Sequence, residues 1–280
     1  MTNPAPALGN GFGVSLAIVG SDKILIGASG NSVEPNTYPG AAYLYDLNGT
    51  RLTAFTNPNP TSIGWSGDQF GYAVVAVGAD KVVISAYQDD AGIAYLFSTD
   101  GVLLTTFTNP TPQFGDLFGS SVTLVGQEKV LIGASSDNSG ASDTGVAYLF
   151  DLDGTLLTTI YNPLPDVSDN FGVSVAALSS DRIIIGASAK SIGATHAGVA
   201  YIFCLPRPTL QIVQSNGTMI VRWEKSSLYS GYMLDCSTNL PGPAHATWSE
   251  VPLPYQTNAT HISVVSSPSS ESRFYRLRKL

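Results

Sequence analysis

Hydrophobic and polar positions along the chain fall into short runs, and the same order of runs recurs four times before residue 204. Each repeat opens with an alternating run such as VSLAIVG, followed by an almost continuous apolar run such as KILIGAS. A third run reads AAYLYDL or VAYLFDL, and a fourth, such as TRLTAFT, alternates threonine with larger apolar residues. Alternation with a period of two predicts strands with one wet face, and a short continuous apolar run predicts a strand covered on both faces. We therefore predict four strands per repeat.

Turn residues separate these predicted strands at regular places. The first and second strands are joined by GSDK, GADK, GQEK and SSDR, and the third and fourth by LNGT, TDGV and LDGT. Asn-Gly and Asp-Gly favour two-residue hairpins, because both central positions of such a turn need positive φ. Antiparallel units of four strands and about 50 residues, repeated in tandem, are typical of β-propeller blades.

The spacing inside the repeat is fixed. A Phe-Gly pair opens each copy, and 14 residues separate its glycine from a second mark, which is Gly-Ala in three copies and Ser-Ala in one. A third mark is Ala-Tyr, and in three copies 14 residues separate its tyrosine from an Asn-Pro pair. The repeats begin near residues 12, 70, 118 and 171, and their second marks begin at Gly27, Ser85, Gly133 and Gly186.

These marks resemble the FG-GAP repeat, which occurs in integrin α-subunit propellers and in many bacterial surface and secreted proteins. The resemblance covers residues 2–204 and implies an all-β fold of four antiparallel blades. Members of that family often carry a calcium loop of the form D-x-N-x-D-G-x-x-D between their first two strands. Here only short turns stand at residues 20–23, 78–81, 126–129 and 179–182, too few oxygens for the six or more ligands of calcium. We therefore expect no metal at these turns and no cofactor.

The repeat pattern stops near Pro208. The last segment contains the predicted strands LQIVQ, MIVRW, YMLDC, HISVV and FYRLR, and it resembles a small immunoglobulin or fibronectin type III-like sandwich. We predict a propeller over residues 1–204 and a β-sandwich over residues 205–280, with a linker at 204–208 that two prolines stiffen.

Composition narrows the function classes. Only 12% of residues are charged and the net charge is −8, which argues against a nucleic-acid partner. No apolar run approaches the ~20 residues of a membrane span. Met1 is followed at once by TNPAPA, without the basic start or apolar stretch of a secretory signal, so we expect a mature or trimmed numbering. The composition and the resemblance together favour an extracellular or cell-surface protein.

Residues with catalytic or redox chemistry are few. The three histidines lie in separate segments without ligand spacing, and no nucleophile elbow or phosphate loop occurs. Asp151 and Asp153 flank a hairpin turn, which explains them better than acid–base catalysis. We therefore expect a protein that is not an enzyme. Cys204 and Cys236 are a candidate disulfide if the protein is extracellular, although a free cysteine also packs as a small apolar residue.

The repeats differ most in the connections from second to third strand and from one repeat to the next. In a propeller these connections emerge on one face, and variable loops on a rigid scaffold are typical of a binding surface for a protein or a glycan. Tyr38, Trp65 and Tyr87 are candidates for stacking on a sugar, with packing of Trp65 and Tyr87 between blades as the alternative. The acidic candidates for cation binding, which solvation explains equally well, are Asp89, Asp90, Asp137 and Asp143.

The fourth repeat lacks a fourth strand, because Pro206 and Pro208 interrupt the chain where it would run. The sequence leaves three outcomes open: a closed four-bladed ring, a part of a longer array, or a blade completed by a neighbouring chain. A bare strand edge pairs readily with another chain. The first function hypothesis is a non-catalytic binding or adhesion protein, and the alternative is a structural subunit that self-assembles through strand edges into a filament or matrix.

Overall fold

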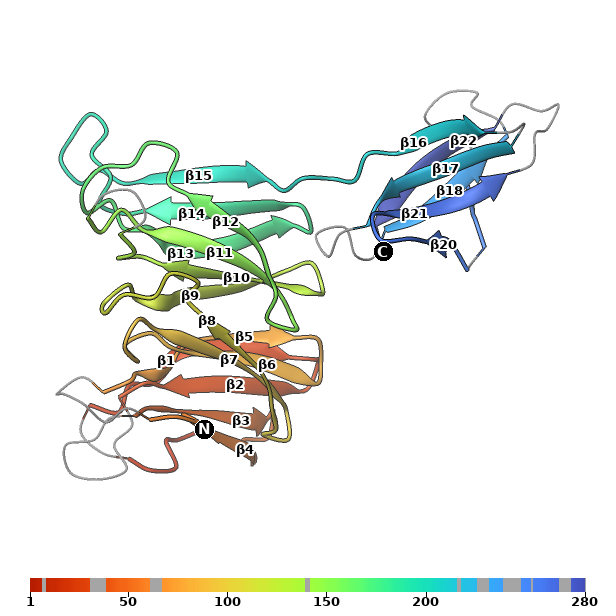
Figure 1. Cartoon of the computed structure of the whole chain (residues 1–280). Helices are drawn as coiled ribbons and strands as arrows, with labels where there is room; N and C mark the ends of the chain where they lie inside the picture. The colour runs from red at the N-terminus through yellow and green to blue at the C-terminus, as the bar shows by residue number, and fades with distance from the viewer. Residues whose placement is uncertain are drawn as a thin grey trace. The chain divides into compact units, whose positions relative to one another are not determined.

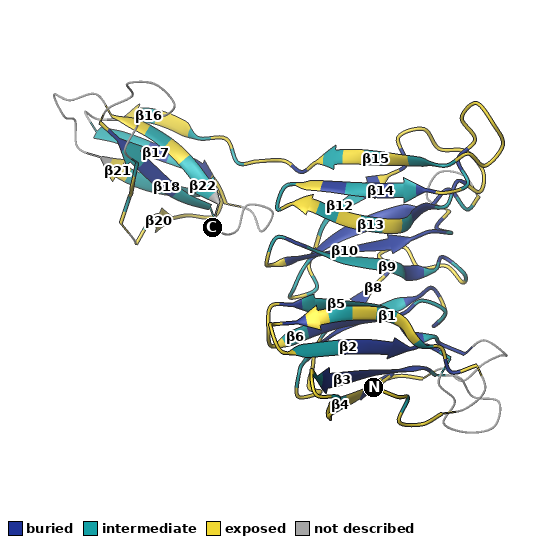
Figure 2. Ribbon diagram, turned by 180° about the vertical axis from the view of Figure 1, so that it is seen from behind, coloured by how far each residue is buried: buried dark blue, intermediate teal, exposed yellow. Residues whose placement is uncertain are grey.

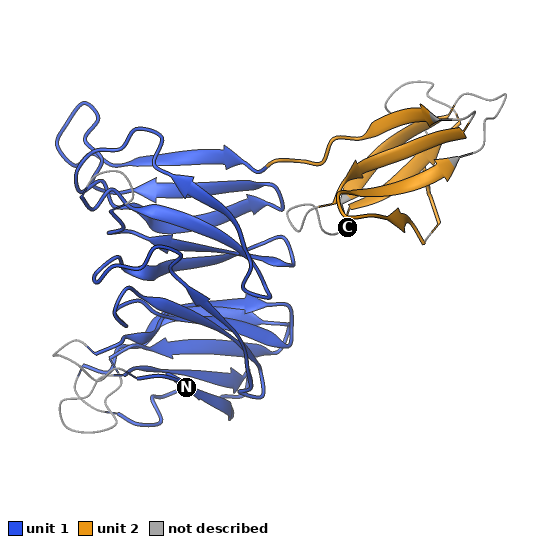
Figure 3. Cartoon of the chain, viewed as in Figure 1, with its two compact units in different colours: residues 1–205 blue, residues 206–280 orange. Residues whose placement is uncertain are grey.

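A computed structural model covers the whole chain. It describes residues 1–6, 9–30, 39–60, 67–138, 142–215, 218–225, 232–238, 248–252, 254–266 and 273–279. These residues form two compact units, 1–205 and 206–280, shown in different colours in Figure 3. Every regular element among them is a β-strand. None of them forms a helix with the length and apolar character needed to cross a membrane.

The first unit contains four antiparallel sheets, each built from strands that follow one another in the sequence (Figure 1). The first three sheets have four strands and the last has three. The prediction of an all-β chain with four-stranded antiparallel blades is confirmed for the first three repeats, and the missing fourth strand of the last repeat is also observed. The first sheet comprises β1 (Phe12–Val19), β2 (Lys23–Ala28), β3 (Ala41–Asp46) and β4 (Arg51–Thr56).

The other sheets of the first unit repeat this order. The second comprises β5 (Phe70–Val77), β6 (Lys81–Ala86), β7 (Ile93–Ser98) and β8 (Leu103–Thr108). The third comprises β9 (Phe118–Val125), β10 (Lys129–Ala134), β11 (Val146–Asp151) and β12 (Leu156–Tyr161). The fourth comprises β13 (Phe171–Ser179), β14 (Arg182–Ala187) and β15 (Val199–Cys204).

Tight turns join the strands within a sheet, as the turn residues predict. Gly49, Gly101 and Gly154 occupy the turns between third and fourth strands with φ of 88°, 89° and 92°, a region that side chains with a Cβ rarely adopt. In the first sheet, Asp46 holds the turn, because its side-chain Oδ1 accepts a hydrogen bond from the Thr50 amide at 2.7 Å. The hairpin turns are therefore fixed by local chemistry that the sequence already displays.

Neighbouring sheets are packed through their first strands: β5 lies against β1, β9 against β5 and β13 against β9. At two of these three contacts the close approach requires glycine in the second strand, whereas Ser85 takes this position in the second sheet. A Cβ on Gly27 would overlap the carbonyl oxygen of Gly71 in the next sheet, and a Cβ on Gly133 would overlap that of Gly172. At these two positions the Gly-Ala mark thus records a contact between blades, because a Cβ would overlap the backbone of the next sheet.

The phenylalanine of each Phe-Gly pair anchors the core. Phe70, Phe118 and Phe171 are fully buried. Phe118 lies 6.0 Å from Phe150 in an edge-to-face arrangement, and Phe171 lies 6.0 Å from Phe203 in the same way. Full burial of such a ring stabilises the fold by roughly 1.5–3 kcal/mol. The repeat therefore places one large aromatic residue at the same core position of each sheet.

The fourth sheet ends the array with one uncovered side. Its neighbour β9 lies against one face, while Ile202 on the other face is 63% exposed. Figure 2 shows exposed stretches on β15 of the fourth sheet and on β1 of the first sheet. The N-terminal residues lie against the first sheet, where the Tyr45 hydroxyl donates a hydrogen bond to the carbonyl oxygen of Thr2 at 3.1 Å.

The second unit contains two antiparallel sheets around a small core of Val221, Trp223 and Leu234. The side chain of Asp235 is also buried and forms ion pairs with Arg276 and Arg278 at 3.0 and 3.2 Å. One sheet comprises β16 (Gln211–Ser215), β17 (Thr218–Glu224), β21 (His261–Ser266) and β20 (Gln256–Thr257). The other comprises β19 (Ser249–Glu250), β18 (Tyr232–Ser237) and β22 (Phe274–Lys279).

Candidate binding face

The connections of the first unit divide between two sides of the sheets (Figure 1). The short hairpin turns lie on one side, which we call the hairpin side. The connections from second to third strand, and the links from one sheet to the next, lie on the other side, which we call the loop side. Because the loop side contains the segments that vary between repeats, it is the candidate binding face.

A buried polar cluster holds each link on the loop side. In the third sheet, Asn109 Nδ2 donates hydrogen bonds to Asp116 Oδ2 at 2.7 Å and to Asp137 Oδ2 at 3.3 Å. The Tyr148 hydroxyl donates to the same Asp137 oxygen at 2.7 Å. These residues come from the link before the sheet, the following loop and the third strand, so the cluster fixes the base of the binding face. The second sheet has the equivalent cluster of Asn57, Asp68, Asp89 and Tyr95.

Two carboxyl groups share this buried site in the third sheet. Burial raises the pKa of Asp116, a hydrogen bond from the Gln113 amide lowers it, and the nearby Asp137 and Asp143 raise it further, so that the net pKa is raised. Its Oδ1 is buried and has no hydrogen-bond partner in the structure. In the second sheet, burial raises the pKa of Tyr95, so its hydroxyl remains a donor to Asn57.

In the fourth sheet the polar cluster contains a lysine in place of the second aspartate. Asn162 donates to Asp169 Oδ2 at 2.7 Å, as in the other clusters. Where the second and third sheets place their second aspartate, however, this sheet places Lys190, whose Nζ lies 3.1 Å from Asp169 Oδ2. Both side chains are almost fully buried. The cluster therefore has an internal cation in this repeat alone among the three described.

The candidate residues proposed from sequence lie in different environments. Tyr38 and Trp65 lie outside the described residues. Tyr87 is half-buried, and its ring stacks on Tyr72 with centroids 4.0 Å apart, which occupies one face of the ring. Burial, followed by the neighbouring Tyr72, raises the pKa of Tyr87.

The four candidate aspartates divide into two pairs. Asp89 and Asp137 are buried members of the polar clusters, so they support the loops from inside. Asp90 is exposed and Asp143 is half-buried; both have positive φ, 55° and 54°, and both lie on the loop side. The carbonyl oxygen of Asp90 accepts a hydrogen bond from Gly115 at 3.2 Å, so each of these loops is tied to the next link.

Exposed apolar side chains on the loop side are the feature that the sequence reasoning missed. Phe114 is 88% exposed and lies in the link between the second and third sheets. Leu164 and Val167 are exposed in the next link, and Ile192 is exposed in the loop between β14 and β15. The available signal was apolar residues inside segments otherwise rich in Pro, Gly and Asp, where no strand pattern explains them.

The remaining sequence candidates are the possible metal ligands, the acidic hairpin turns and the two cysteines. Within the described ranges, no group of three or more His, Cys, Asp or Glu side chains is arranged to hold a metal ion. At the hairpin turns, Asp22 pairs with Lys23 at 3.1 Å and Asp80 with Lys81 at 3.0 Å. Cys204 ends β15 and is exposed with a free thiol. Cys236, on β18, is half-buried and also a free thiol.

Comparison with solved structures includes weak likenesses such as the following two. One is to a structure from a study of two prolyl endopeptidases, with 14% identity and a TM-score of 0.31 over 75% of this chain. The chain spans 38% of that protein's length. The other is to the WD40 domain of coronin from Toxoplasma gondii, with 9% identity and a TM-score of 0.34, covering 92% of this chain and 82% of that one. With TM-scores below 0.5, neither likeness bears on function.

No curated protein matches the chain. The family comparison does give a match, and it falls on the first three strands of the third sheet, on the fourth sheet, and on the link before the third sheet with part of the link before the fourth. Residues 107–150 and 165–203 match the FG-GAP repeat, and the sheets that contain them belong to a propeller-like set of antiparallel blades.

Proposed function

We propose that this protein is a non-catalytic, extracellular or cell-surface binding protein, and that its loop side docks on another protein. The observation that carries the proposal is the exposed Phe114 on a link whose base is fixed by Asn109 and Asp116. A rigid base beneath an exposed aromatic residue favours binding, because little conformational entropy is lost when the partner docks. Phenylalanine is also enriched at protein interfaces relative to other surfaces.

The neighbouring links extend the same surface. Leu164 and Val167 are about as exposed as Leu47 and Val102 on the hairpin turns. They differ in that hydrogen bonds hold the backbone of their link. The Ser168 amide donates to the Ser142 carbonyl at 2.9 Å, which joins this link to the loop of the third sheet. Several apolar side chains on rigid links, with acidic residues such as Asp143 and Asp166 between them, form the kind of apolar patch with polar rim that binds proteins.

The acidic rim indicates the charge of the partner. The chain has a net charge of −8, and on this side Asp90 and Asp166 are exposed and Asp143 is half-buried. We therefore propose a partner with a basic or neutral contact surface, because like charges would slow association and weaken binding. Sugar stacking by Tyr38, Trp65 and Tyr87 stays a secondary proposal. So does cation binding by the candidate aspartates, which are Asp89, Asp90, Asp137 and Asp143.

A second candidate function rests on the open edge of β15. The fourth sheet ends at this strand, and unpaired backbone groups on an edge are a template for another strand. Pairing there between copies would build a filament or matrix. Such assembly requires no residue of the loop side, so the two functions are separable.

The test is binding of purified chain to a panel of purified secreted and surface proteins and to a glycan array. The loop-side variant Phe114→Ser/Val167→Ser is expected to lose binding by roughly 30-fold or more, the effect of losing an interface hot spot. Both side chains are exposed, so the variant should fold normally, which circular dichroism and thermal unfolding check.

The matched control is Leu47→Ser/Val102→Ser, which removes two exposed apolar residues of similar exposure from the hairpin side. This control is expected to bind like the unaltered chain. Equal loss in both variants, or loss in the control alone, would contradict the proposal. Binding only to the glycan array, unaffected by Phe114, would move the function to the sugar-binding alternative.

A further inference from the structure

The two ends of the blade array carry opposite halves of one contact. The outward face of β1, which we call the leading face, presents Gly13, Val14, Leu16 and Ile18. The outward face of the fourth sheet, which we call the trailing face, presents Ser174, Leu178, Ile184, Gly186 and Ile202. Between consecutive blades inside the chain, residues equivalent to these two sets face each other.

Compared with the third sheet, the trailing face has no sheet among the described residues that buries its apolar side chains. The residues of the third sheet that match Ile184 and Ile202 are Leu131 and Leu149, and both are fully buried beneath the fourth sheet. Ile202, by contrast, is 63% exposed. The same apolar positions are therefore kept in the last repeat, although no described residue of the first unit covers them.

The apolar side chains of the leading face are likewise more exposed than their counterparts in the third sheet. Val14, Leu16 and Ile18 are 48%, 64% and 74% exposed. Their counterparts in β9, which are Ser120, Val122 and Leu124, are only half-exposed, because the preceding sheet packs on that strand. Alternating apolar residues on an exposed strand face are unusual unless another surface covers them.

A serine and a glycine form the polar part of the contact. Ser15 Oγ donates to the carbonyl oxygen of Gly71 at 2.8 Å, and Ser121 Oγ donates to that of Gly172 at 2.7 Å. In each case the glycine of the second strand leaves room for that carbonyl.

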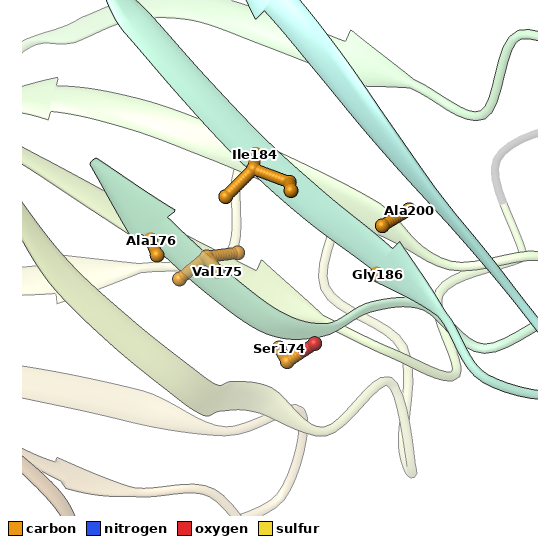
Figure 4. Close-up of a pocket in the computed structure, with 6 residues that line it drawn as sticks. All are labelled: Ser174, Val175, Ala176, Ile184, Gly186 and Ala200. Atoms are coloured by element: carbon orange, nitrogen blue, oxygen red, sulfur yellow. The ribbon is translucent and has the colours of Figure 1, made fainter. Parts of the chain in front are cut away.

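The trailing face also has a serine and a second-strand glycine at these positions, but among the described residues no glycine carbonyl oxygen from a following sheet lies against them. Ser174 and Gly186 line a shallow pocket with Ile184 and Ala200, as Figure 4 shows. The three heavy atoms nearest to a Cβ on Gly186 all belong to Ser174. No described residue supplies the glycine carbonyl that fills this place in the first and third sheets.

The missing carbonyl has a counterpart on the leading face. Gly13 has φ of +93°, and Gly71, Gly119 and Gly172 have φ of 91°, 91° and 89°. Those three glycines are closely approached by the preceding sheet, whereas a Cβ on Gly13 would meet nothing within 4 Å. Gly13 is thus preset in the docking conformation without a sheet to dock on.

We propose that the leading face docks on the trailing face of a second copy of this chain. Gly13 of one copy then presents its carbonyl oxygen to Ser174 and Gly186 of the other, and Leu16 and Ile18 cover Ile184 and Ile202. The contact repeats a packing that the chain makes three times internally, which is why a second copy fits better than an unrelated partner. Two copies contribute eight blades, the upper end of the usual propeller range, so two such contacts close a ring.

The test is the mass of the full chain by sedimentation velocity and light scattering across a concentration series. A chain mass of 29.3 kDa predicts a dimer of 2 × 29.3 = 58.6 kDa. Leu16→Arg/Ile18→Arg and, separately, Ile202→Arg should each give a monomer, with at least a tenfold weaker association. Val102→Arg, an equally exposed apolar residue on a hairpin turn, is the matched control and should remain dimeric.

Mixing the two variants separates this proposal from its alternatives. Each variant keeps one intact face, so an equimolar mixture should form a mixed dimer through one native contact. A monomeric unaltered chain, a dimer that persists in both variants, or a mixture that stays monomeric would overturn the proposal. Assemblies larger than two copies would contradict the closed ring. Pairing through the β15 edge needs nothing from β1, so it would leave the Leu16→Arg/Ile18→Arg variant associated.

Discussion

On the loop side, a single residue decides whether the buried aspartate of a link has a second aspartate or a lysine beside it. The three described clusters share one asparagine and one aspartate, yet the third partner is Asp89, Asp137 or Lys190. The chain therefore contains its own comparison of like and opposite charges at a buried site. Removal of a charge should therefore have opposite effects on stability in the third and fourth sheets.

Replacement of Asp116 by asparagine should stabilise the protein at neutral pH. The folded-state pKa of Asp116 is raised, so the folded protein binds more protons than the unfolded chain just above pH 3.8. The free energy of unfolding therefore falls as pH rises through the interval between the two pKa values and stays lowered above it. Asp116→Asn keeps an oxygen to accept from Asn109 and removes the charge, so we expect a gain of about 1 kcal/mol at pH 7.

Urea unfolding of both proteins at pH 4 and pH 7 measures this difference. The matched control is Asp153→Asn, whose carboxyl is exposed on a hairpin and has a pKa lowered by a hydrogen bond from the Thr155 amide. That control should lose stability above its unfolded pKa, the opposite sign. A lower stability of Asp116→Asn at pH 7 would contradict the argument.

Lys190 should be needed only while Asp169 is charged. Lys190→Met leaves a buried carboxylate without its cation, and loss of one partner of such a pair costs about 3–5 kcal/mol. The double variant Asp169→Asn/Lys190→Met removes both charges and should recover most of the loss. Chemical denaturation of the single and double variants checks this, and equal destabilisation of both would show that the ion pair is not the cause.

At the scale of the elements, the repeat encodes both a sheet and the way the next sheet docks on it. The second-strand glycine has no role within its own hairpin, since Ser85 replaces it in the second sheet without loss of register. Its role is the approach of the next blade, as the overlap between a Cβ on Gly133 and the Gly172 carbonyl shows. The repeat unit therefore includes half of a contact at each face.

Gly133→Ala should separate the third and fourth sheets, and Gly186→Ala should not. The added methyl at residue 133 meets backbone of the next sheet, which cannot move aside, so we expect a loss of about 3 kcal/mol. At residue 186 the atom nearest to the methyl is the Ser174 hydroxyl oxygen, which can rotate away, so the loss should stay below about 1 kcal/mol. Thermal unfolding at low protein concentration compares the two, and equal losses would contradict the docking role of this glycine.

The strands and hairpins were predictable from sequence, because alternation and turn residues act locally. For instance, Gly154 and Asp153 mark a hairpin that the structure contains. The burial of Asp89 and Asp137 was not predictable in the same way, since it depends on Asn57 and Asn109 reaching across a link. Exposure of Phe114 was missed for a similar reason, because an apolar residue in a link packs or projects according to the backbone around it.

At the scale of the whole molecule, a constant hairpin side is combined with a variable loop side. The sheets repeat their register and their docking contacts, while the loops differ in length and in exposed groups. That combination allows the binding surface to change without altering the core, which is the usual layout of a scaffold for recognition. A bridge between Cys204 and Cys236 stays a proposal, and thiol titration of the denatured, unreduced protein decides it: two free thiols exclude it.

The most direct test of the central claim, that the loop side is the binding face, is hydroxyl-radical footprinting with and without a bound panel protein. Oxidation of Phe114, Leu164 and Val167 should fall at least threefold on binding, because these exposed side chains become covered. Leu47 and Val102 on the hairpin side should be oxidised equally in both states. Protection of the hairpin residues, with Phe114 unchanged, would contradict the account.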